Sequence, residues 1–406
     1  MKRGTKLLYK KIFAGLLGGG MLFMPNWSYA LPSGGQVVTN NGTITAGGKV
    51  MDITGSGNVA IDWNSFNIAA DEIVNFKNMQ AVLNYVSGGR KSEIFGKLNG
   101  AGVNVFLVNP NGILFGKTAQ VNVGQLTAST RSLEKAALNS FNGSLSPLDA
   151  GGAANVKADI INLGKLKAGK LVLEGNNLSI IGADSLEVAD KSKITLRAGE
   201  NINIGYEVTD KTTIDVGDGK GNTHQVSDYG KGGGDKASDV LSAASVTDLK
   251  GSAKSINDAM LVHDVYELQA IDRNTGTING SSYVVGNYML AGDIDAGDTK
   301  NWNSGRGFDP IGRLNRTGNG VTGSFSGAFD GICHSIQNLY IRQIGNQYDG
   351  YIGLFEGIGK GGSVGNVNMA GGHIEGTSNF GSIAGLYWGT IYNIFNSAEL
   401  VCRSGG

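Results

Sequence analysis

Val105-Phe-Leu-Val-Asn-Pro-Asn-Gly-Ile-Leu-Phe-Gly116 is a stretch in which two short apolar runs are joined by a turn signal. Within it, Pro110 fixes its own φ angle, and the pair Asn111-Gly112 tolerates the positive φ that a tight turn requires. Residues 118–130 follow, where apolar and polar residues alternate as they do along a half-buried β-strand. The stretch therefore predicts a strand, a hard turn and further strands.

Short alternating runs of the same kind recur along the chain, separated by Gly, Asn and Asp. Between residues 160 and 204 their centres recur about every eight residues, a spacing typical of all-β architectures. The chain has 66 glycines and five prolines. A β-sandwich could share this spacing, but repeated small corners along a long chain favour a right-handed parallel β-helix. We expect an all-β solenoid with about 20 residues per coil, forming a rod on the order of 80–90 Å long at roughly 4.8 Å per coil.

The turn stretch also carries a family resemblance. Asn109-Pro-Asn-Gly-Ile113 resembles the NPNGI motif in the secretion domain of two-partner-secretion exoproteins, the family of filamentous haemagglutinins and large bacterial adhesins. Three further segments resemble that family's amino-terminal block and stand in its usual order: Asp62-Trp-Asn-Ser-Phe-Asn-Ile68, Asn84-Tyr-Val-Ser-Gly-Gly89 and Ile94-Phe-Gly-Lys-Leu98. The resemblance covers residues 31 to 129, and the family's second, NPNL-like motif is not visible.

This resemblance implies a partner and a role. The partner is an outer-membrane two-partner-secretion transporter with periplasmic binding domains, and the residues that would serve its recognition are Asn109, Pro110, Asn111, Gly112 and Ile113. The implied product is a secreted or surface-displayed adhesin of a Gram-negative bacterium, which binds a glycan or protein on host or neighbouring cells. The alternative is the secretion domain of a haemolysin or contact-dependent inhibition toxin. Taken singly, Asn109 and Asn111 could also be ordinary corner residues.

The first thirty residues predict a secretory signal peptide. A positive region with Lys2 and Arg3 precedes an apolar run from Ile12 to Met24. Ser28-Tyr-Ala30 then provides a small-x-small cleavage site, so we expect cleavage between Ala30 and Leu31. The apolar run is shorter than the roughly 20 residues that a bilayer span needs.

Four parts are expected along the chain. They are the signal peptide (1–30), a secretion β-helix of the haemagglutination-activity type (31–205), a loop-rich linker (206–260) and a repeat region (261–406). The linker prediction rests on glycine-rich stretches within 206–260. In the repeat region an Asn recurs about every 27–28 residues, at Asn338, Asn366 and Asn393, and the pattern is similar to the GLUG-type β-solenoid repeat of bacterial surface proteins.

Several function classes are disfavoured. Acidic and basic residues balance at 34 each. The sequence has no basic stripe of the kind that nucleic-acid binding requires, so we expect no nucleic-acid partner. The four histidines lie far apart outside any zinc motif, and Asp293, Asp295 and Asp298 lack the spacing of a calcium loop. A polysaccharide lyase would need clustered carboxylates with Arg or Lys, and no such cluster is evident. We therefore expect no enzyme activity, catalytic residue, cofactor or metal.

Two cysteines lie in the last third of the chain. Cys333 and Cys402 could pair if the chain reaches an oxidising compartment, but nothing in the sequence places their Cα atoms within bonding range. The residues up to Gly406 do not form the polar closing coil that a solenoid end requires, which favours a fragment of a longer protein.

Overall fold

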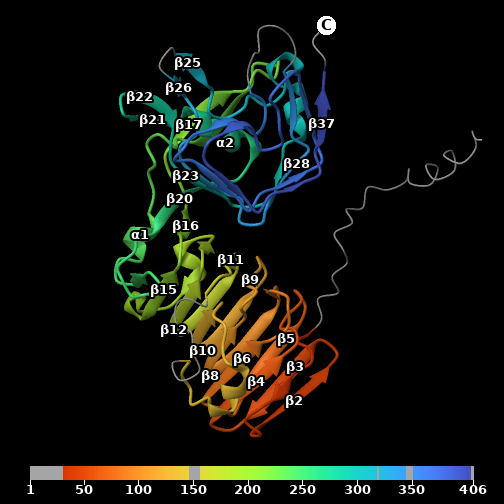
Figure 1. The fold of residues 1–406 in the computed structure, drawn as a ribbon, viewed down its shortest axis with the longest axis vertical. Coiled ribbons are helices and arrows are strands. Elements are labelled where there is room, and N and C mark those ends of the chain that lie inside the picture. Colours follow the sequence, from red (N-terminus) through yellow and green to blue (C-terminus); the bar gives the residue numbers. More distant parts are fainter. Residues whose placement is uncertain (1–30, 146–155, 318–319, 344–350, 404–406) are drawn as a thin grey trace, which may run out of the picture.

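The computed structural model describes residues 31–145, 156–317, 320–343 and 351–403. The predicted signal peptide, with Ala30, lies outside the described residues, which begin at Leu31. Parallel strands stack along two solenoid bodies, which Figure 1 shows joined near β16 (Ile202–Tyr206) and β20 (Asn257–Val262). The predicted all-β parallel β-helix is confirmed.

Two long sheets carry most of the fold. The twelve-stranded sheet contains β1 (Gln36–Val37), β2 (Gly42–Gly47), β3 (Val50–Gly55), β4 (Asn58–Trp63), β5 (Ile73–Lys77), β6 (Ala81–Val86), β8 (Lys97–Val108), β10 (Gln120–Ser129), β12 (Lys165–Gly175), β14 (Leu186–Glu187), β15 (Ile194–Ala198) and β19 (Ser245–Thr247). The ten-stranded sheet contains β16 and β20 together with β7 (Ser92–Ile94), β9 (Ile113–Phe115), β11 (Ile160–Asn162), β13 (Leu178–Ile180), β23 (Asn287–Leu290), β27 (Ala328–Asp330), β31 (Ser363–Gly365) and β35 (Thr390–Tyr392).

The remaining strands form small sheets and hairpins. They are β17 (Lys211–Asp215), β18 (Thr223–Ser227), β21 (Thr275–Ile278), β22 (Ser281–Val284), β24 (Ile294–Asp295), β25 (Asn315–Thr317), β26 (Gly320–Thr322), β28 (Ser335–Gln337), β29 (Tyr340–Gln343), β30 (Phe355–Ile358), β32 (Asn368–Ala370), β33 (His373–Gly376), β34 (Ala384–Tyr387), β36 (Phe395–Asn396) and β37 (Glu399–Cys402). The α-helices are α1 (Ala237–Val240) and α2 (Val265–Ala270), with 3-10 turns at Lys135–Ser140, Ala183–Ser185, Lys191–Lys193, Ile271–Arg273, Gly297–Asn301 and Asn303–Gly305. Within the described ranges, no helix has the length and apolarity to cross a bilayer.

Each coil of the amino-terminal solenoid places the same kind of residue at the same point. Val59 pairs with Val82 and Val82 with Val105, a step of 23 residues each time. The column continues through Leu126 and Leu171, and all five side chains are at most 1% exposed. The step from Leu126 to Leu171 is longer because the chain leaves the coil between β10 and β11. Stacked aliphatic columns of this kind explain why the periodic pattern predicts a solenoid.

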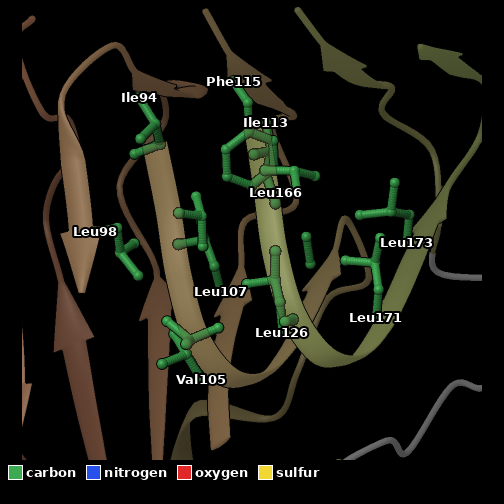
Figure 2. Close-up of a cluster of buried hydrophobic side chains, with 14 of the residues drawn as sticks. Ile94, Leu98, Val105, Leu107, Ile113, Phe115, Leu126, Leu166, Leu171 and Leu173 are labelled. Atoms are coloured by element: carbon green, nitrogen blue, oxygen red, sulfur yellow. The ribbon is translucent and has the colours of Figure 1, made fainter. Parts of the chain in front are cut away.

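Strand alternation sets which side chains enter this core. In β12, Leu166 and Leu171 are buried while Lys165, Lys167 and Lys170 are exposed, as expected when successive residues point to opposite faces. Figure 2 shows labelled side chains from β7, β8, β9, β10 and β12 gathered in one buried cluster. The second run of the motif stretch, β9, contributes Ile113 and Phe115 to it.

The amino-terminal end of the solenoid is closed by antiparallel strands. β1 pairs antiparallel with β4, and β2 and β3 form a hairpin whose second strand continues into the parallel ladder with β5. A reversed strand occupies an edge that would otherwise offer free backbone groups for pairing.

The segment 206–260 differs from the expected loop-rich linker. It contains the β17–β18 hairpin, α1 and β19, and the strands at its two ends, β16 and β20, pair directly with each other. The segment is therefore an excursion from a continuous sheet. The hydrophobic core nevertheless divides at this point, because Ile204 belongs to the first core and Tyr206 to the second. The hairpin was missed because few of its strand residues are buried: Ile214 in β17, and Val226 and Ser227 in β18.

The predicted repeat of three asparagines holds for two of them. Asn366 directly follows β31 and Asn393 directly follows β35, which pair in register, and the Asn393 amide donates to Asn366 Oδ1 at 3.1 Å. Asn338 is wrong as a member of this column, because the register of β28 on β32 places it opposite Gly371. All three have a positive φ, between 50° and 59°. Asn tolerates a positive φ at many corners of a coil. An Asn in the sequence therefore indicates a corner, but it does not indicate which corner of the coil.

Candidate functional site

The Asn109–Gly112 turn lies at the end of β8 and leads into β9. The Gly112 N–H donates to the Asn109 carbonyl at 3.1 Å, which closes a four-residue turn with Pro110 at its second position. Gly112 has a φ of 109°, whereas Asn111 does not take a positive φ. Of the Asn111-Gly112 pair, for which the sequence predicts a positive φ, only the glycine adopts one.

Asn109 is fully buried and holds the turn from inside. Its side-chain amide donates to the Arg90 carbonyl at 2.9 Å and to Ser92 Oγ at 3.0 Å. Its Oδ1 accepts the Asn111 N–H at 2.9 Å. Both hydrogens of the amide and its oxygen are thus satisfied, as a buried polar group requires. Asn109 ties the turn to the preceding coil.

The other motif residues divide between the interior and the surface. Ile113 is buried in the core and pairs with Ser92 and Ile160 on the two flanking strands. Pro110 is half-buried, and Asn111 is exposed although its amide donates to the Gly88 carbonyl at 2.8 Å. The motif therefore presents Pro110 and Asn111 outward.

The structure brings the other resembling segments beside this turn. Trp63 Nε1 donates to Asn84 Oδ1 at 3.0 Å, which joins the first two of them. Asn67 Oδ1 accepts the Glu93 N–H at 2.9 Å, next to the third. Gly88, which bonds Asn111, is required there because a Cβ would lie 1.8 Å from the Asn64 carbonyl oxygen. Segments separated along the chain thus form one bonded unit.

Sequence reasoning missed a buried ion cluster one coil further on. Arg131 donates to both oxygens of Glu174 at 2.7 Å, Ser129 Oγ donates to it at 2.8 Å, and Arg197 approaches at 3.2 Å. Burial alone would raise the pKa of Glu174, but the bonds from Arg131 and Ser129 outweigh it and hold that pKa below its ordinary value. The Asn109 N–H donates to the Ser129 carbonyl, so the cluster adjoins the motif turn. Arg131 and Glu174 lie 43 positions apart, and no sequence pattern connects the two.

A groove lies on the outward side of the turn. It has a volume of about 490 Å³. Asn111, Gly112 and Leu114 line one wall, and residues of the carboxy-terminal solenoid, among them Asn366, Asn368 and Phe395, line the other. The motif therefore faces the second solenoid body across a narrow space.

The candidate reactive groups do not converge. Among the residues that the structure describes, no three of His, Cys, Asp and Glu are placed to hold a metal ion. His263 bonds Glu267 and Glu207, His373 bonds Glu399, and His224 stacks on Tyr266. Cys333 and Cys402 are free thiols. Asp293 and Asp295 accept corner hydrogen bonds from Ser335 and Gly297.

Comparisons with known proteins point to one family. The profile of the TPS secretion domain matches residues 28–295. A heme/hemopexin-binding protein of Haemophilus influenzae strain Rd is 33% identical over 177 residues, which cover 42% of this chain and 19% of that protein. Halomucin of Haloquadratum walsbyi is 27% identical over 279 residues, covering 68% of this chain and 3% of that protein. The chain thus spans less than a fifth of the curated relatives it matches.

Two solved secretion domains also align with the chain. The HMW1 secretion domain of Haemophilus influenzae has 16% identity and a TM-score of 0.29, and the alignment covers 91% of this chain and 84% of that one. The filamentous hemagglutinin secretion domain has 13% identity and a TM-score of 0.28, with 92% and 99% covered.

Proposed function

Because the chain belongs to the TPS secretion domain family, we propose that it is exported by an outer-membrane two-partner-secretion transporter and forms the secretion end of a surface adhesin. The observation that carries this is the bonded unit around Asn109–Ile113, in which a buried Asn109 fixes a turn that presents Pro110 and Asn111 outward. In this proposal the transporter's periplasmic domains bind the chain through that region.

In this proposal, folding of the parallel ladder outside the cell favours export. Each inward column adds one residue per coil, as Val82 does on Val59 and Val105 on Val82. A coil that has folded outside the cell offers an edge on which the next coil pairs, because edge strands present unpaired N–H and C=O groups. Each added coil also buries aliphatic side chains, and this opposes backward movement of the chain.

The adhesin part of the proposal is supported by the outer surface of the last coils. Of the large hydrophobic side chains exposed in the described residues, Tyr387, Trp388, Phe395 and Leu400 lie close together in sequence, with exposures of 59%, 50%, 64% and 44%. Tyr387 and Trp388 are adjacent at the end of β34, whereas Phe395 and Leu400 lie on two other sheets and Phe395 lines the groove beside the motif. An exposed aromatic pair is typical of an interaction surface, and we propose that Tyr387 and Trp388 contribute to binding a glycan or protein on a host or neighbouring cell.

Export is tested by producing the chain with and without the transporter in a Gram-negative host. The protein should reach the medium or the cell surface only when the transporter is present. Equal extracellular amounts without the transporter would contradict the proposed partner.

Adhesion needs a separate test. Beads that carry residues 31–406 should bind target cells saturably, and Trp388→Ala should weaken binding, whereas Val240→Ala, a 40% exposed residue on α1, should not. Export without saturable binding would instead favour the secretion end of a haemolysin or contact-dependent inhibition toxin.

A further inference from the structure

The groove beside the motif turn has the chemistry of a ligand site. We propose that it binds a short neutral saccharide, held by hydrogen bonds to side-chain oxygens and by contact of a sugar ring with Phe395. Tyr387 and Trp388 are not among the residues that line this groove. The site is therefore separate from the terminal aromatic pair, and its occupation depends neither on export nor on the transporter.

The clearest indication of a ligand is an unpaired oxygen. Asn368 lines the groove, and its Oδ1 is buried without a hydrogen-bond partner among the described residues. Asp62 Oδ1 is also buried and unpaired, but it belongs to a carboxylate whose Oδ2 pairs with Lys135, away from the groove. A buried acceptor that stays unpaired costs folding free energy. A hydroxyl group of a ligand would donate to the Asn368 oxygen and remove that cost.

Two further oxygens come from the amino-terminal solenoid, on Asp159 and Asn111, which both line the groove. Within the described residues, Asp159 accepts through Oδ1 alone, from Asn177 N and Nδ2 at 2.9 Å each. The Asn111 side chain uses its Nδ2, which donates to the Gly88 carbonyl at 2.8 Å. Asp159 Oδ2 and Asn111 Oδ1 can thus accept from a ligand. Together with Asn368 Oδ1, they favour a ligand that offers several O–H donors.

The charge of the groove favours a neutral ligand. Its charged lining residues are Lys91 and Asp159, one of each sign, and Lys91 Nζ pairs with Glu93 Oε1 at 2.9 Å. Burial raises the pKa of the Cys333 thiol, which also lines the groove and is therefore neutral at pH 7. Tight binding of a divalent cation requires several carboxylates, and an anion requires clustered cationic or N–H donors. The described lining residues supply neither set.

Apolar side chains complete the groove. Phe395 is 64% exposed and lies beside Asn368 in the register of β36 on β32, so the ring and the amide stand on the same face of the sheet. Leu114 and Ile161, neighbours in the register of β9 and β11, line the other wall. A sugar matches both kinds of surface, because its hydroxyls donate and accept hydrogen bonds while the C–H face of its ring packs on aromatic and aliphatic side chains.

The two walls are fixed relative to each other. Asp330 is 3% exposed, and its Oδ2 accepts Ser179 Oγ of the amino-terminal solenoid at 2.7 Å. Its Oδ1 accepts Nδ2 of the groove residue Asn366 at 2.9 Å. The volume of about 490 Å³ lies within the roughly 300–1,000 Å³ of small-molecule sites. A preformed site of this kind loses little conformational freedom when a ligand binds.

The test measures binding of maltose, cellobiose, lactose and chitobiose to the folded chain of residues 31–406 by isothermal titration calorimetry. Asn368→Ala removes the unpaired oxygen and Phe395→Ala removes the ring. Ile278→Ala is the matched control, since Ile278 is 42% exposed on the β21–β22 hairpin. At least one disaccharide should bind saturably. Each groove variant should raise its Kd about three- to ten-fold, the loss expected for one hydrogen bond or ring contact, and Ile278→Ala should leave the Kd unchanged.

Stability separates a binding role of Asn368 from a structural one. Asn368→Ala deletes a buried acceptor that has no partner among the described residues, so the urea midpoint of this variant should equal or exceed that of wild type. A lowered midpoint would show that Asn368 supports the fold, and its effect on binding would then not count for the proposal. Phe395→Ala, at an exposed position, carries the test in that case.

The two cysteines give a second readout. Both are exposed free thiols, but only Cys333 lines the groove, whereas Cys402 lies in β37. At a sugar concentration about ten times Kd, the reaction of Cys333 with N-ethylmaleimide should slow about ten-fold, because only the unoccupied groove reacts. The reaction of Cys402 should keep its rate, as peptide mass mapping reports.

Four results would overturn the proposal. They are the absence of saturable binding by any of the four disaccharides, binding that Phe395→Ala leaves unchanged, labelling of Cys333 that the bound sugar does not slow, and protection of Cys333 by calcium or spermidine but by no disaccharide. If Trp388→Ala removes sugar binding and Phe395→Ala retains it, the sugar binds at the terminal aromatic pair and the groove is not its site.

Discussion

Asn109 donates its side-chain amide to the Arg90 carbonyl at 2.9 Å from a fully buried position. The first residue of the motif therefore clamps one coil to the preceding one and offers nothing to a partner in the folded chain. Asn111, two residues on, is exposed. The two asparagines of the motif thus meet two different physical requirements.

Asn109→Ala should lower the free energy of unfolding by about 2–4 kcal/mol, because it leaves the Arg90 carbonyl, Ser92 Oγ and Asn111 N–H without their buried partner. Asn111→Ala removes an exposed bond to Gly88 and should cost about 0.5–1 kcal/mol. Urea unfolding followed by circular dichroism measures both. Equal losses would contradict the division between a buried clamp and an exposed turn residue.

Arg131→Ala should destabilise the solenoid by about 3–5 kcal/mol, since it leaves the Glu174 carboxylate buried with a reduced set of donors. Arg131→Ala combined with Glu174→Gln should recover part of that loss, because the uncompensated charge is gone. Urea unfolding of the two variants decides this. If the double variant is less stable than Arg131→Ala, the uncompensated charge of Glu174 does not cause the loss of stability.

The pair His263–Glu267 should make stability depend on pH. The hydrogen bond to Glu267 raises the pKa of His263 to about 9. Burial opposes ionisation of Glu267, but bonds from His263 and Ser227 lower its pKa to about 2. The stabilisation from His263 is complete below its ordinary pKa of 6.5 and is lost as pH rises through 9; that from Glu267 is complete above 4.5 and is lost as pH falls through 2.

His263→Gln should therefore remove the decline in unfolding free energy between pH 6.5 and 9. His373→Gln serves as a comparison, since His373 bonds Glu399 and takes no part in the His263–Glu267 pair, and this variant should keep the decline. A wild-type profile that rises across this range would contradict the assignment.

Glu356→Gln should stabilise the chain above pH 7. Burial raises the pKa of Glu356 to about 7, so the unfolded chain ionises at lower pH than the folded one. Stability then falls as pH rises from about 4.5 to 7, and the glutamine variant lacks that fall. The difference in urea midpoint between wild type and variant should be larger at pH 8 than at pH 5. An equal difference in urea midpoint at pH 5 and pH 8 would contradict the raised pKa of Glu356.

The sequence supported the solenoid because inward columns such as Val59, Val82 and Val105 repeat aliphatic residues at nearly constant spacing. The motif turn was predictable for a different reason: Pro110 and Gly112 have strong local backbone preferences. Two other contacts could not be predicted. Arg131 and Glu174 are 43 positions apart and Ser179 and Asp330 are 151 positions apart, and no local sequence signal connects either pair. Asn338 was assigned to the wrong column because an asparagine reports a left-handed corner and not its place in the coil.

The most direct measurement of the central claim is the amount of protein in the medium when the transporter is co-expressed with wild type, with Asn109→Ala plus Asn111→Ala, or with Asn75→Ala plus Asn99→Ala. The last pair removes stacked asparagines of the same solenoid outside the motif, where Asn99 Nδ2 donates to Asn75 Oδ1 at 3.0 Å. Export should be abolished for the motif pair and retained for the control pair, with equal amounts of all three inside the cells. Undiminished export of the motif pair would contradict the account.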